Sequence, residues 1–378
     1  MAVQETKKRV VWVDLFRILA TCFVPMAHLC SNVINQTPGV LSSDYITLNF
    51  VNSMCRWVVP AFVMISGVFF LNKDKPCDPK VIFKKNIVRM ATAFIFWSLI
   101  YAVQQSFLPA IGSHKEIPAF SLKAFVNDFI SGEYHMWYLY MVAALYLVTP
   151  LIKVFTDNAT KKQLETFMVL SFIFTNVIPM LLCFPFIKQF EFDNVYDYLH
   201  LSTVSGYAGL YVGGQYMVRY PFRKKVRTFI YAMGILGYLL MAGCNLWLSV
   251  RNDKPTKAFL DADNAASVMV AYALFTFFQH VVSKVEFKEK AIKIIKWLSA
   301  RSFGAYLCHV LVMRCFQYFG IQVIHFDPKI ARVDLTHLPY VHFPPLIAIP
   351  LLTLLVVIGS FGVSFIVSKI PVLKKYVV

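Results

Sequence analysis

Charged residues are scarce in this chain. Asp, Glu, Lys and Arg make up 15% of its 378 residues, whereas 58% are hydrophobic, and the mean hydropathy is +0.60. About a quarter of the residues of a soluble globular protein are charged, so this composition excludes an ordinary water-soluble domain. We expect one transmembrane domain over residues 1–378 with no separate soluble domain.

Several familiar motifs are also missing. The chain contains no Gly-x-Ser-x-Gly elbow, no Walker loop and no His-x4-Asp motif. Its eight cysteines lack disulfide or zinc spacing, and we expect them to be small apolar packing residues. No metal site is expected either, because the histidines and aspartates of the segment Gly320–Phe343 match no zinc signature.

Long apolar runs dominate the chain instead. Eight stretches hold no charged residue, and each reaches the roughly 18 residues that a helix needs to cross the hydrocarbon. Two further segments hold one arginine each, Arg56 and Arg314. Because backbone groups in lipid must be satisfied internally and the hydrophobicity is continuous, these segments predict helices rather than a barrel. The sequence thus predicts an all-α integral membrane protein with about ten transmembrane helices: Ile18–Ser43, Thr47–Leu71, Met90–His114, Tyr134–Ile152, Thr166–Ile187, Tyr198–Val218, Thr228–Val250, Asn264–Ser283, Ser302–Phe319 and Leu335–Ser368.

Positive charge alternates along the loops. If the amino terminus is cytoplasmic, most of the 37 Lys and Arg residues fall in cytoplasmic segments, as the positive-inside rule requires, and both termini are cytoplasmic. The formal charge of +17 therefore indicates contact with membrane lipids and not with nucleic acid. The basic start Lys7-Lys8-Arg9 is expected to be retained, because Asp14 and Arg17 interrupt the following apolar run.

The first span carries three ionisable residues on one face. Arg17 and His28 are 11 positions apart, so they lie about 20° apart around the helix axis and about 16 Å apart along it. Asp14 lies within about 60° of both. One interpretation is an Asp14–Arg17 pair that snorkels to the surface, with His28 a buried hydrogen-bonding group. The other is a polar shaft with an anion site at its cytoplasmic mouth and a base deeper in, since intramembrane charges usually serve a function.

Five ordered motifs extend this pattern. They are Phe62-Val-Met-Ile-Ser66-Gly67, Phe83-Lys84-Lys85-Asn86-Ile-Val-Arg89, Trp97 to Tyr101, His135-Met-Trp137-Tyr-Leu139, and Ser302-Phe-Gly304-Ala-Tyr306-Leu-Cys-His309. With Arg17-x10-His28, this set resembles acyltransferase family 3, the membrane O-acyltransferases that modify bacterial surface polysaccharides. Family members often carry a further arginine in the second of these motifs, where this chain has Asn86.

The resemblance implies acyl transfer, most simply of acetyl, from cytoplasmic acyl-CoA to a hydroxyl of a surface glycan or lipid-linked sugar. It implies acetyl-CoA or another acyl-CoA as co-substrate, no permanently bound cofactor, and a multi-pass protein of the bacterial cytoplasmic membrane. The implied catalytic residues are His28 as general base, Arg17, and Asp14 as the group that orients Arg17. Donor binding is expected from Arg17, Ser66, Lys84, Lys85 and Arg89, and acceptor binding from Arg56, His135, Trp137, Tyr306 and His309.

Simpler interpretations of these residues stay open. Lys84, Lys85 and Arg89 are also what ordinary positive-inside flanks would look like, and Trp137 suits an aromatic belt. Ser66-Gly67 favours close helix packing, and Tyr306 and His309 can serve interhelical hydrogen bonds. Arg56 has no local acid and is expected to face a cavity, whereas Arg314 is expected to snorkel. The alternative functions are a transporter or glycan exporter without acyl transfer, and a non-enzymatic sensor.

Overall fold

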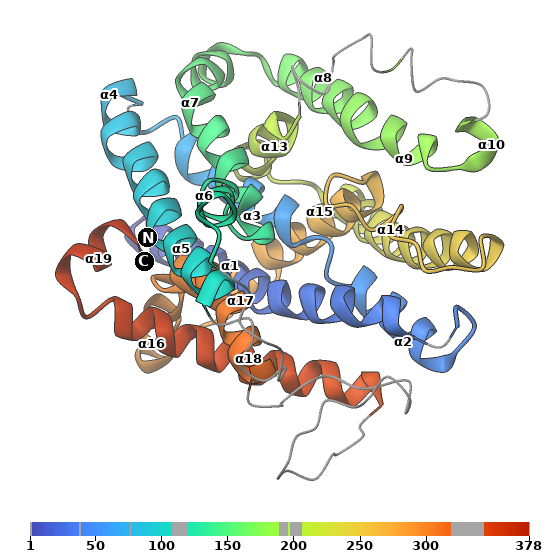
Figure 1. Cartoon of the computed structure of the whole chain (residues 1–378). Helices are drawn as coiled ribbons and strands as arrows, with labels where there is room; N and C mark the ends of the chain where they lie inside the picture. Colours follow the sequence, from blue (N-terminus) through green and yellow to red (C-terminus); the bar gives the residue numbers. More distant parts are fainter. Residues whose placement is uncertain are drawn as a thin grey trace.

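The structure, a computed structural model, is a bundle of helices (Figure 1). It describes residues 2–37, 39–75, 77–107, 120–188, 196, 206–318 and 344–377, and no strand occurs among them. The helices longer than ten residues are α1 (Ala2–Val33), α2 (Ser43–Ser53), α3 (Val58–Phe70), α5 (Val88–Phe107), α7 (Trp137–Asn158), α8 (Lys161–Phe172), α13 (Ala208–Arg219), α14 (Lys224–Arg251), α15 (Ala265–His280), α16 (Glu289–Ser299), α17 (Ser302–Tyr318) and α18 (Pro345–Val367).

Shorter elements join these helices. Two are π-helical turns, η2 (Ile82–Ile87) and η4 (Ile173–Val177), and three are 3-10 turns, η1 (Ile34–Gln36), η3 (Tyr134–Met136) and η5 (Val282–Lys284). The remaining short α-helices are α4 (Pro79–Val81), α6 (Leu122–Ser131), α9 (Ile178–Leu182), α10 (Pro185–Lys188) and α19 (Pro371–Tyr376).

Eight segments of the described chain are long and apolar enough to cross a membrane. They are Val11–Val33, Ser43–Phe70, Pro79–Ser106, Leu122–Asn158, Lys161–Leu182, Lys224–Arg251, Ala265–Lys284 and Pro345–Val367, and each overlaps one of the ten spans expected from the sequence. The other two expected spans, Tyr198–Val218 and Ser302–Phe319, correspond to the shorter helices α13 and α17. Residues 198–205 of the first of these spans lie outside the described residues. The expectation of an all-helical membrane bundle is thus confirmed at the level of eight candidate spans.

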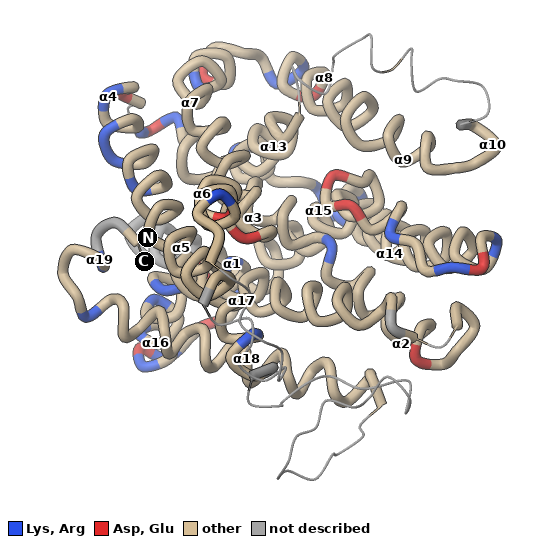
Figure 2. The backbone as a smooth tube through the Cα atoms, in the orientation of Figure 1, with Lys and Arg blue, Asp and Glu red and all other residues tan. Residues whose placement is uncertain are grey.

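Residues at the same end of the bundle contact one another across helices and loops. At one end of the bundle, Lys153 Nζ donates to the Asn72 carbonyl at 2.9 Å, and Arg219 Nη1 donates to the Thr156 carbonyl at 3.0 Å. At the other end, Lys257 Nζ donates to the Ser31 carbonyl at 3.0 Å. Figure 2 shows Lys and Arg around α4, around α16 and near α19, and charged residues also at α6 and around α15 in the middle of the view.

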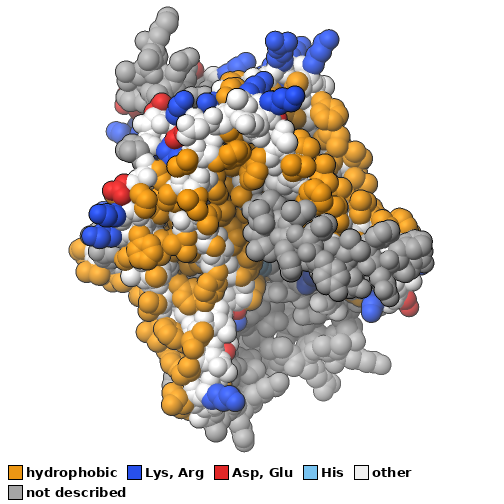
Figure 3. All heavy atoms as spheres, turned by 90° about the horizontal axis from the view of Figure 1, so that it is seen from above, with side chains coloured by type: hydrophobic (Ala, Val, Ile, Leu, Met, Phe, Trp, Pro, Cys, Tyr) orange, Lys and Arg blue, Asp and Glu red, His pale blue; other side chains and the backbone are white. Residues whose placement is uncertain are grey.

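The outward faces of the helices are apolar, as contact with lipid requires. Leu151 is 74% exposed, Ile358 61% and Leu346 65%, and large hydrophobic side chains cover a broad part of the surface in Figure 3. In water such a contiguous patch would drive aggregation, whereas in a bilayer it meets acyl chains at no cost.

Helices α3 and α13 pack closely because glycines remove side chains from their interface. A Cβ at Gly67 would lie 1.8 Å from the Tyr211 carbonyl oxygen, and a Cβ at Gly214 would lie 2.0 Å from the Met64 carbonyl oxygen. Small residues at such crossings allow the backbones to approach, so dispersion contacts replace the missing hydrophobic drive between helices in lipid. The close approach of α13 to Gly67 fits the packing role expected for this glycine. It also holds the turn of α3 that precedes Gly67 in place.

Replacing Gly214 by Ala should push α3 and α13 apart, because its Cβ would meet backbone atoms that cannot move independently. We expect a lower midpoint of thermal unfolding in detergent, measured by tryptophan fluorescence. Gly243→Ala is the matched control, since a Cβ there meets nothing within 4 Å and alanine is the better helix former. Equal stability of the two variants would contradict this account of the interface.

Candidate functional site

Helix α1 buries one face and turns another toward open space. Trp12, Phe16, Ala20 and Val24 recur every four residues and are all buried. Phe16 stacks on Trp57 with ring centroids 5.5 Å apart, and Trp12 and Phe16 both contact Phe275 edge-on. This apolar stripe fixes the rotation of α1 and leaves its polar face, with Arg17 and His28, toward two cavities.

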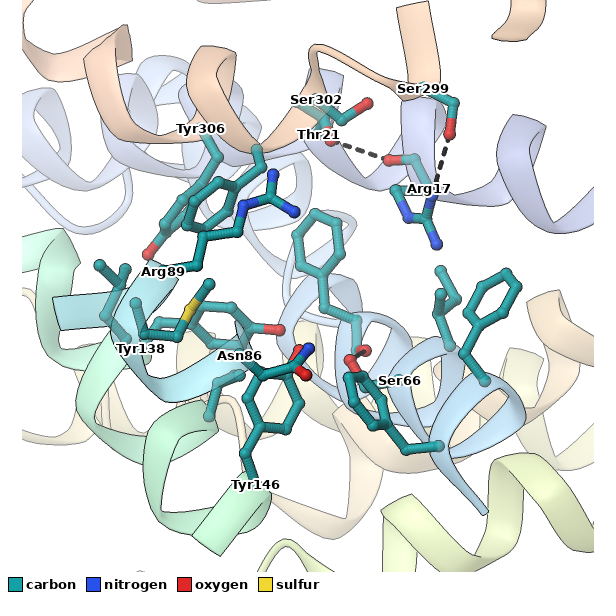
Figure 4. Close-up of a pocket in the computed structure, with 18 of the residues that line it drawn as sticks. Arg17, Thr21, Ser66, Asn86, Arg89, Tyr138, Tyr146, Ser299, Ser302 and Tyr306 are labelled. Carbon is teal, nitrogen blue, oxygen red and sulfur yellow. Dashed lines mark hydrogen bonds between the residues drawn. The ribbon is translucent and has the colours of Figure 1, made fainter. Parts of the chain in front are cut away.

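The first space, called here the Arg17 cavity, has a volume of about 390 Å³ (Figure 4). It lies among α1, α3, α7, the junction of η2 with α5, and the turn from α16 to α17. The polar residues that line it are Arg17, Thr21, Ser66, Asn86, Arg89, Tyr138, Tyr146, Ser299, Ser302 and Tyr306.

A small network holds Arg17 in this cavity. Its Nη1 donates to Ser299 Oγ at 3.0 Å and lies 3.4 Å from Asp14 Oδ1, while Ser299 Oγ donates to the same carboxylate oxygen at 2.7 Å. The expected Asp14–Arg17 pair is therefore present, but it is tied to α16 instead of snorkelling. Ser299 was not identified from the sequence, because it lies 285 residues from Asp14 and only the fold brings the two together.

A second guanidinium faces the same space. Arg89 lies over the ring of Phe303 at 5.2 Å, and Ser66 lines the cavity while its hydroxyl donates to the Phe62 carbonyl at 2.9 Å. Lys84 and Lys85 are exposed and line neither this cavity nor the second one, whereas Asn86 lines this one. Two arginines line the Arg17 cavity, and one carboxylate, that of Asp14, pairs with Arg17. This balance of charge suits an anionic ligand.

The second space, called the His28 cavity, has a volume of about 370 Å³. It brings together five residues that the sequence singled out, together with three polar residues that it did not. The expected ones are His28, Arg56, His135, Trp137 and Tyr306, and the others are Tyr207, Asp261 and Asp263.

Three histidines meet beside this cavity. His28 stacks on His309 with ring centroids 5.2 Å apart, and His135 contacts His309 edge-on at 4.7 Å. His309 Nδ1 lies 2.5 Å from the Tyr306 carbonyl, and His135 Nε2 lies 3.2 Å from the Leu307 carbonyl. Since a carbonyl only accepts, we assign a proton to each of these nitrogens, which leaves the second nitrogen of each neutral ring as an acceptor. His309 is buried behind His28 and does not itself line the cavity.

Arg56 lies on another wall of the His28 cavity. Its Nη2 donates to Ser31 Oγ at 2.8 Å and to Asn52 Oδ1 at 2.5 Å, so neutral acceptors hold it. Arg56 was expected to face a cavity, and it lines this one. Asp261 and Asp263, in the loop before α15, add carboxylates to the same cavity. Burial raises the pKa of both carboxyl groups, and Arg56 opposes this shift at Asp261.

The turn that carries His135 is fixed from two sides. Tyr306 donates its hydroxyl proton to the His135 carbonyl at 2.5 Å, and Arg314 forms an ion pair of 2.8 Å with the buried Glu133. The expectation that Arg314 snorkels is therefore wrong. Its partner is 181 residues away in sequence and directly precedes the expected span Tyr134–Ile152.

The two cavities share a wall. Phe62, Tyr138 and Tyr306 line both of them, so the continuous polar shaft expected from α1 is divided by aromatic side chains. The histidines and aspartates of the segment Gly320–Phe343, in which no metal site is expected, lie outside the described residues.

Comparison with known proteins adds the family. A family model described as an acyltransferase domain matches residues 10–368, which include every residue of both cavities. No curated protein and no solved structure matches the chain significantly. Because the family model covers nearly the whole chain, and eight helices are long and apolar enough to span a bilayer, this multi-pass membrane protein belongs to acyltransferase family 3.

Proposed function

We propose that this protein is an O-acyltransferase that moves an acyl group, most simply acetyl, from acyl-CoA to a hydroxyl of a surface glycan or lipid-linked sugar. The observation that carries the proposal is the pair of cavities along α1. One presents Arg17 and Arg89 for the phosphates of the donor, and the other presents His28 among groups that can hold a hydroxylated acceptor.

The proposed orientation follows from the loops. The Arg17 cavity adjoins the end of the bundle where the basic segments 72–85 and 284–301 lie, and the positive-inside rule favours the cytoplasmic side for these segments. The membrane would be the bacterial inner membrane, as the resemblance implies. Cytoplasmic acyl-CoA would thus enter beside Arg17, and the acceptor would reach His28 from the opposite side. The 11 residues from Arg17 to His28 correspond to about 16 Å along α1, a distance that the pantetheine arm would span.

The chemistry then needs one base and no redox partner. His28 would take the proton of the acceptor hydroxyl as its oxygen bonds to the acyl carbon, and the carbon–sulfur bond of the thioester would break. The leaving thiolate would receive that proton, so the products are the acyl ester and free CoA. His309, stacked on His28, would help to orient the imidazole, while Asp14 and Ser299 would hold Arg17 against the donor.

The acceptor would bind against mixed polar and aromatic walls. Asp261 and Asp263 supply acceptors for sugar hydroxyl protons, Arg56 supplies donors, and Trp137 and Tyr207 lie with ring centroids 6.4 Å apart at the same cavity. Flat rings beside converging polar groups are the ordinary composition of a small-molecule site.

Replacing His28 by Ala should reduce acyl transfer by about 10²–10⁴-fold, the usual contribution of a general base. The assay measures free CoA released from acetyl-CoA by purified protein in the presence of candidate acceptors. His280→Ala is the matched control, because His280 lines neither cavity. Normal transfer by the His28 variant would overturn the assignment, and a wild-type protein that never releases CoA would favour the transporter alternative.

Substitutions of Arg17 and of the exposed lysines Lys84 and Lys85 should change the KM for acyl-CoA in different ways. Replacing Arg17 by Gln removes a charge-assisted contact worth about 1.5–3 kcal/mol, so the KM for acyl-CoA should rise about 10- to 150-fold at any ionic strength. Lys84→Ala with Lys85→Ala should act only through long-range attraction, because these side chains lie outside the cavity.

Steady-state kinetics at low and high salt separate the two cases. We expect the effect of the double lysine variant to vanish at high salt, whereas the Arg17 effect persists and leaves the KM for the acceptor unchanged. A salt-independent loss in the lysine variant would instead assign Lys84 and Lys85 to direct phosphate contact.

A further inference from the structure

Three aromatic rings form the shared wall of the two cavities. Phe62 comes from α3, Tyr138 from α7 and Tyr306 from α17, and each ring contacts both others. The centroid distances are 5.9 Å for Phe62–Tyr138, 6.4 Å for Phe62–Tyr306 and 5.6 Å for Tyr138–Tyr306. We call this set the ring triad; Figure 4 shows Tyr138 and Tyr306 from the side of the Arg17 cavity.

The members of the ring triad are held differently. Tyr306 is buried, and its hydroxyl is bonded to the His135 carbonyl, so this ring is anchored at both ends. Phe62 is half-buried and has no polar side-chain atom, so packing alone holds its ring. A rotamer change of Phe62 breaks no hydrogen bond, whereas displacement of Tyr306 would leave a buried carbonyl unpaired. The easiest ring to move is therefore Phe62, against a fixed Tyr306.

Without the ring triad the two cavities would join. Arg17 and His28 are both half-buried, so each cavity offers a polar space beside a charged or titratable side chain. A continuous polar path through the helix bundle would let water and ions cross the membrane, and channels prevent such leakage with hydrophobic constrictions.

From this geometry we propose that the ring triad is a gate between the two cavities. In the closed form it separates water on the two sides, and movement of Phe62 admits the acyl end of the donor to His28. The passage of an acyl-thioester rests on the proposed function, whereas the separation of the two cavities does not.

The gate has a chemical consequence for an acyl donor. If water reaches the thioester, its oxygen bonds to the acyl carbon, the carbon–sulfur bond breaks, and the products are the free acid and CoA. A closed gate keeps the thioester away from water in the His28 cavity until an acceptor has displaced that water. An opened gate should therefore raise hydrolysis at the expense of transfer.

Two positions on α3 report on the gate without any need for activity. Val59 lines the His28 cavity and Ser66 lines the Arg17 cavity, one turn before and one turn after Phe62. Each would be replaced by Cys, and a charged, membrane-impermeant methanethiosulfonate would be added to right-side-out or inside-out membrane vesicles. Mass spectrometry of the peptides identifies the modified cysteine, so the native cysteines can remain.

With the ring triad intact, we expect Val59→Cys to react from one side of the membrane only and Ser66→Cys from the opposite side only. Adding Phe62→Ala should make both react from both sides. Tyr138→Ala removes a different ring and should have the same effect, which covers the case in which the Phe62 variant fails to fold. Phe167→Ala is the control, because Phe167 is also half-buried but lines neither cavity. Labelling from both sides with the intact triad, or one-sided labelling after ring removal, would overturn the gate.

A second measurement tests the link to acyl transfer. Phe62→Ala should raise CoA release from acetyl-CoA several-fold in the absence of acceptor and lower acyl transfer when acceptor is present. Phe167→Ala should change neither quantity. If the wild-type protein releases no CoA under any condition, the proposed function fails, and the labelling pattern still decides whether the gate exists. If the protein transfers acyl groups but Phe62→Ala leaves hydrolysis unchanged, the water-excluding role of the gate is wrong.

Discussion

A guanidinium inside a bilayer needs either a partner or a polar space, and this requirement organises the structure around α1. Arg17 has both, because Asp14 and Ser299 hold one side of it and the Arg17 cavity meets the other. The bond from Ser299 to Asp14 also ties α16, whose other side chains are largely exposed, to the first helix. The network of Asp14, Arg17 and Ser299 thus fixes the contact between α1 and α16 and, with it, one wall of the Arg17 cavity.

Apolar packing supplies the rigidity that such a site needs. The stripe from Trp12 to Val24 fixes the rotation of α1, and the glycine contacts between α3 and α13 fix the depth of α3. Phe62 and Ser66 lie on that same length of α3, so the close contact with α13 also places the residues that line both cavities. At the opposite end, the Arg314–Glu133 pair fixes the turn that carries His135. The helices and turns that carry the cavity-lining residues are therefore positioned by packing contacts and ion pairs outside the two cavities.

The parts of this arrangement that depend on local periodicity were predictable from the sequence. The common face of Arg17 and His28, the packing role of Gly67 and the cavity position of Arg56 follow from helical geometry and the cost of intramembrane charge. Ser299, Asp261 and Glu133 were not predictable as site or partner residues, because they reach their neighbours only through contacts over long stretches of chain. Spacing along a single helix also could not show that three rings from α3, α7 and α17 divide the polar space.

The π-helical turn η2, Ile82–Ile87, accounts for a further difference between sequence and structure. It widens the helix just before Arg89, and on its path Asn86 and Arg89 face the cavity while Lys84 and Lys85 face outward. A π-turn amounts to one additional residue in an α-helix. The register of the residues before this turn is therefore offset from that of α5 by about 100° around the axis, and this offset decides which side chains of η2 face the Arg17 cavity.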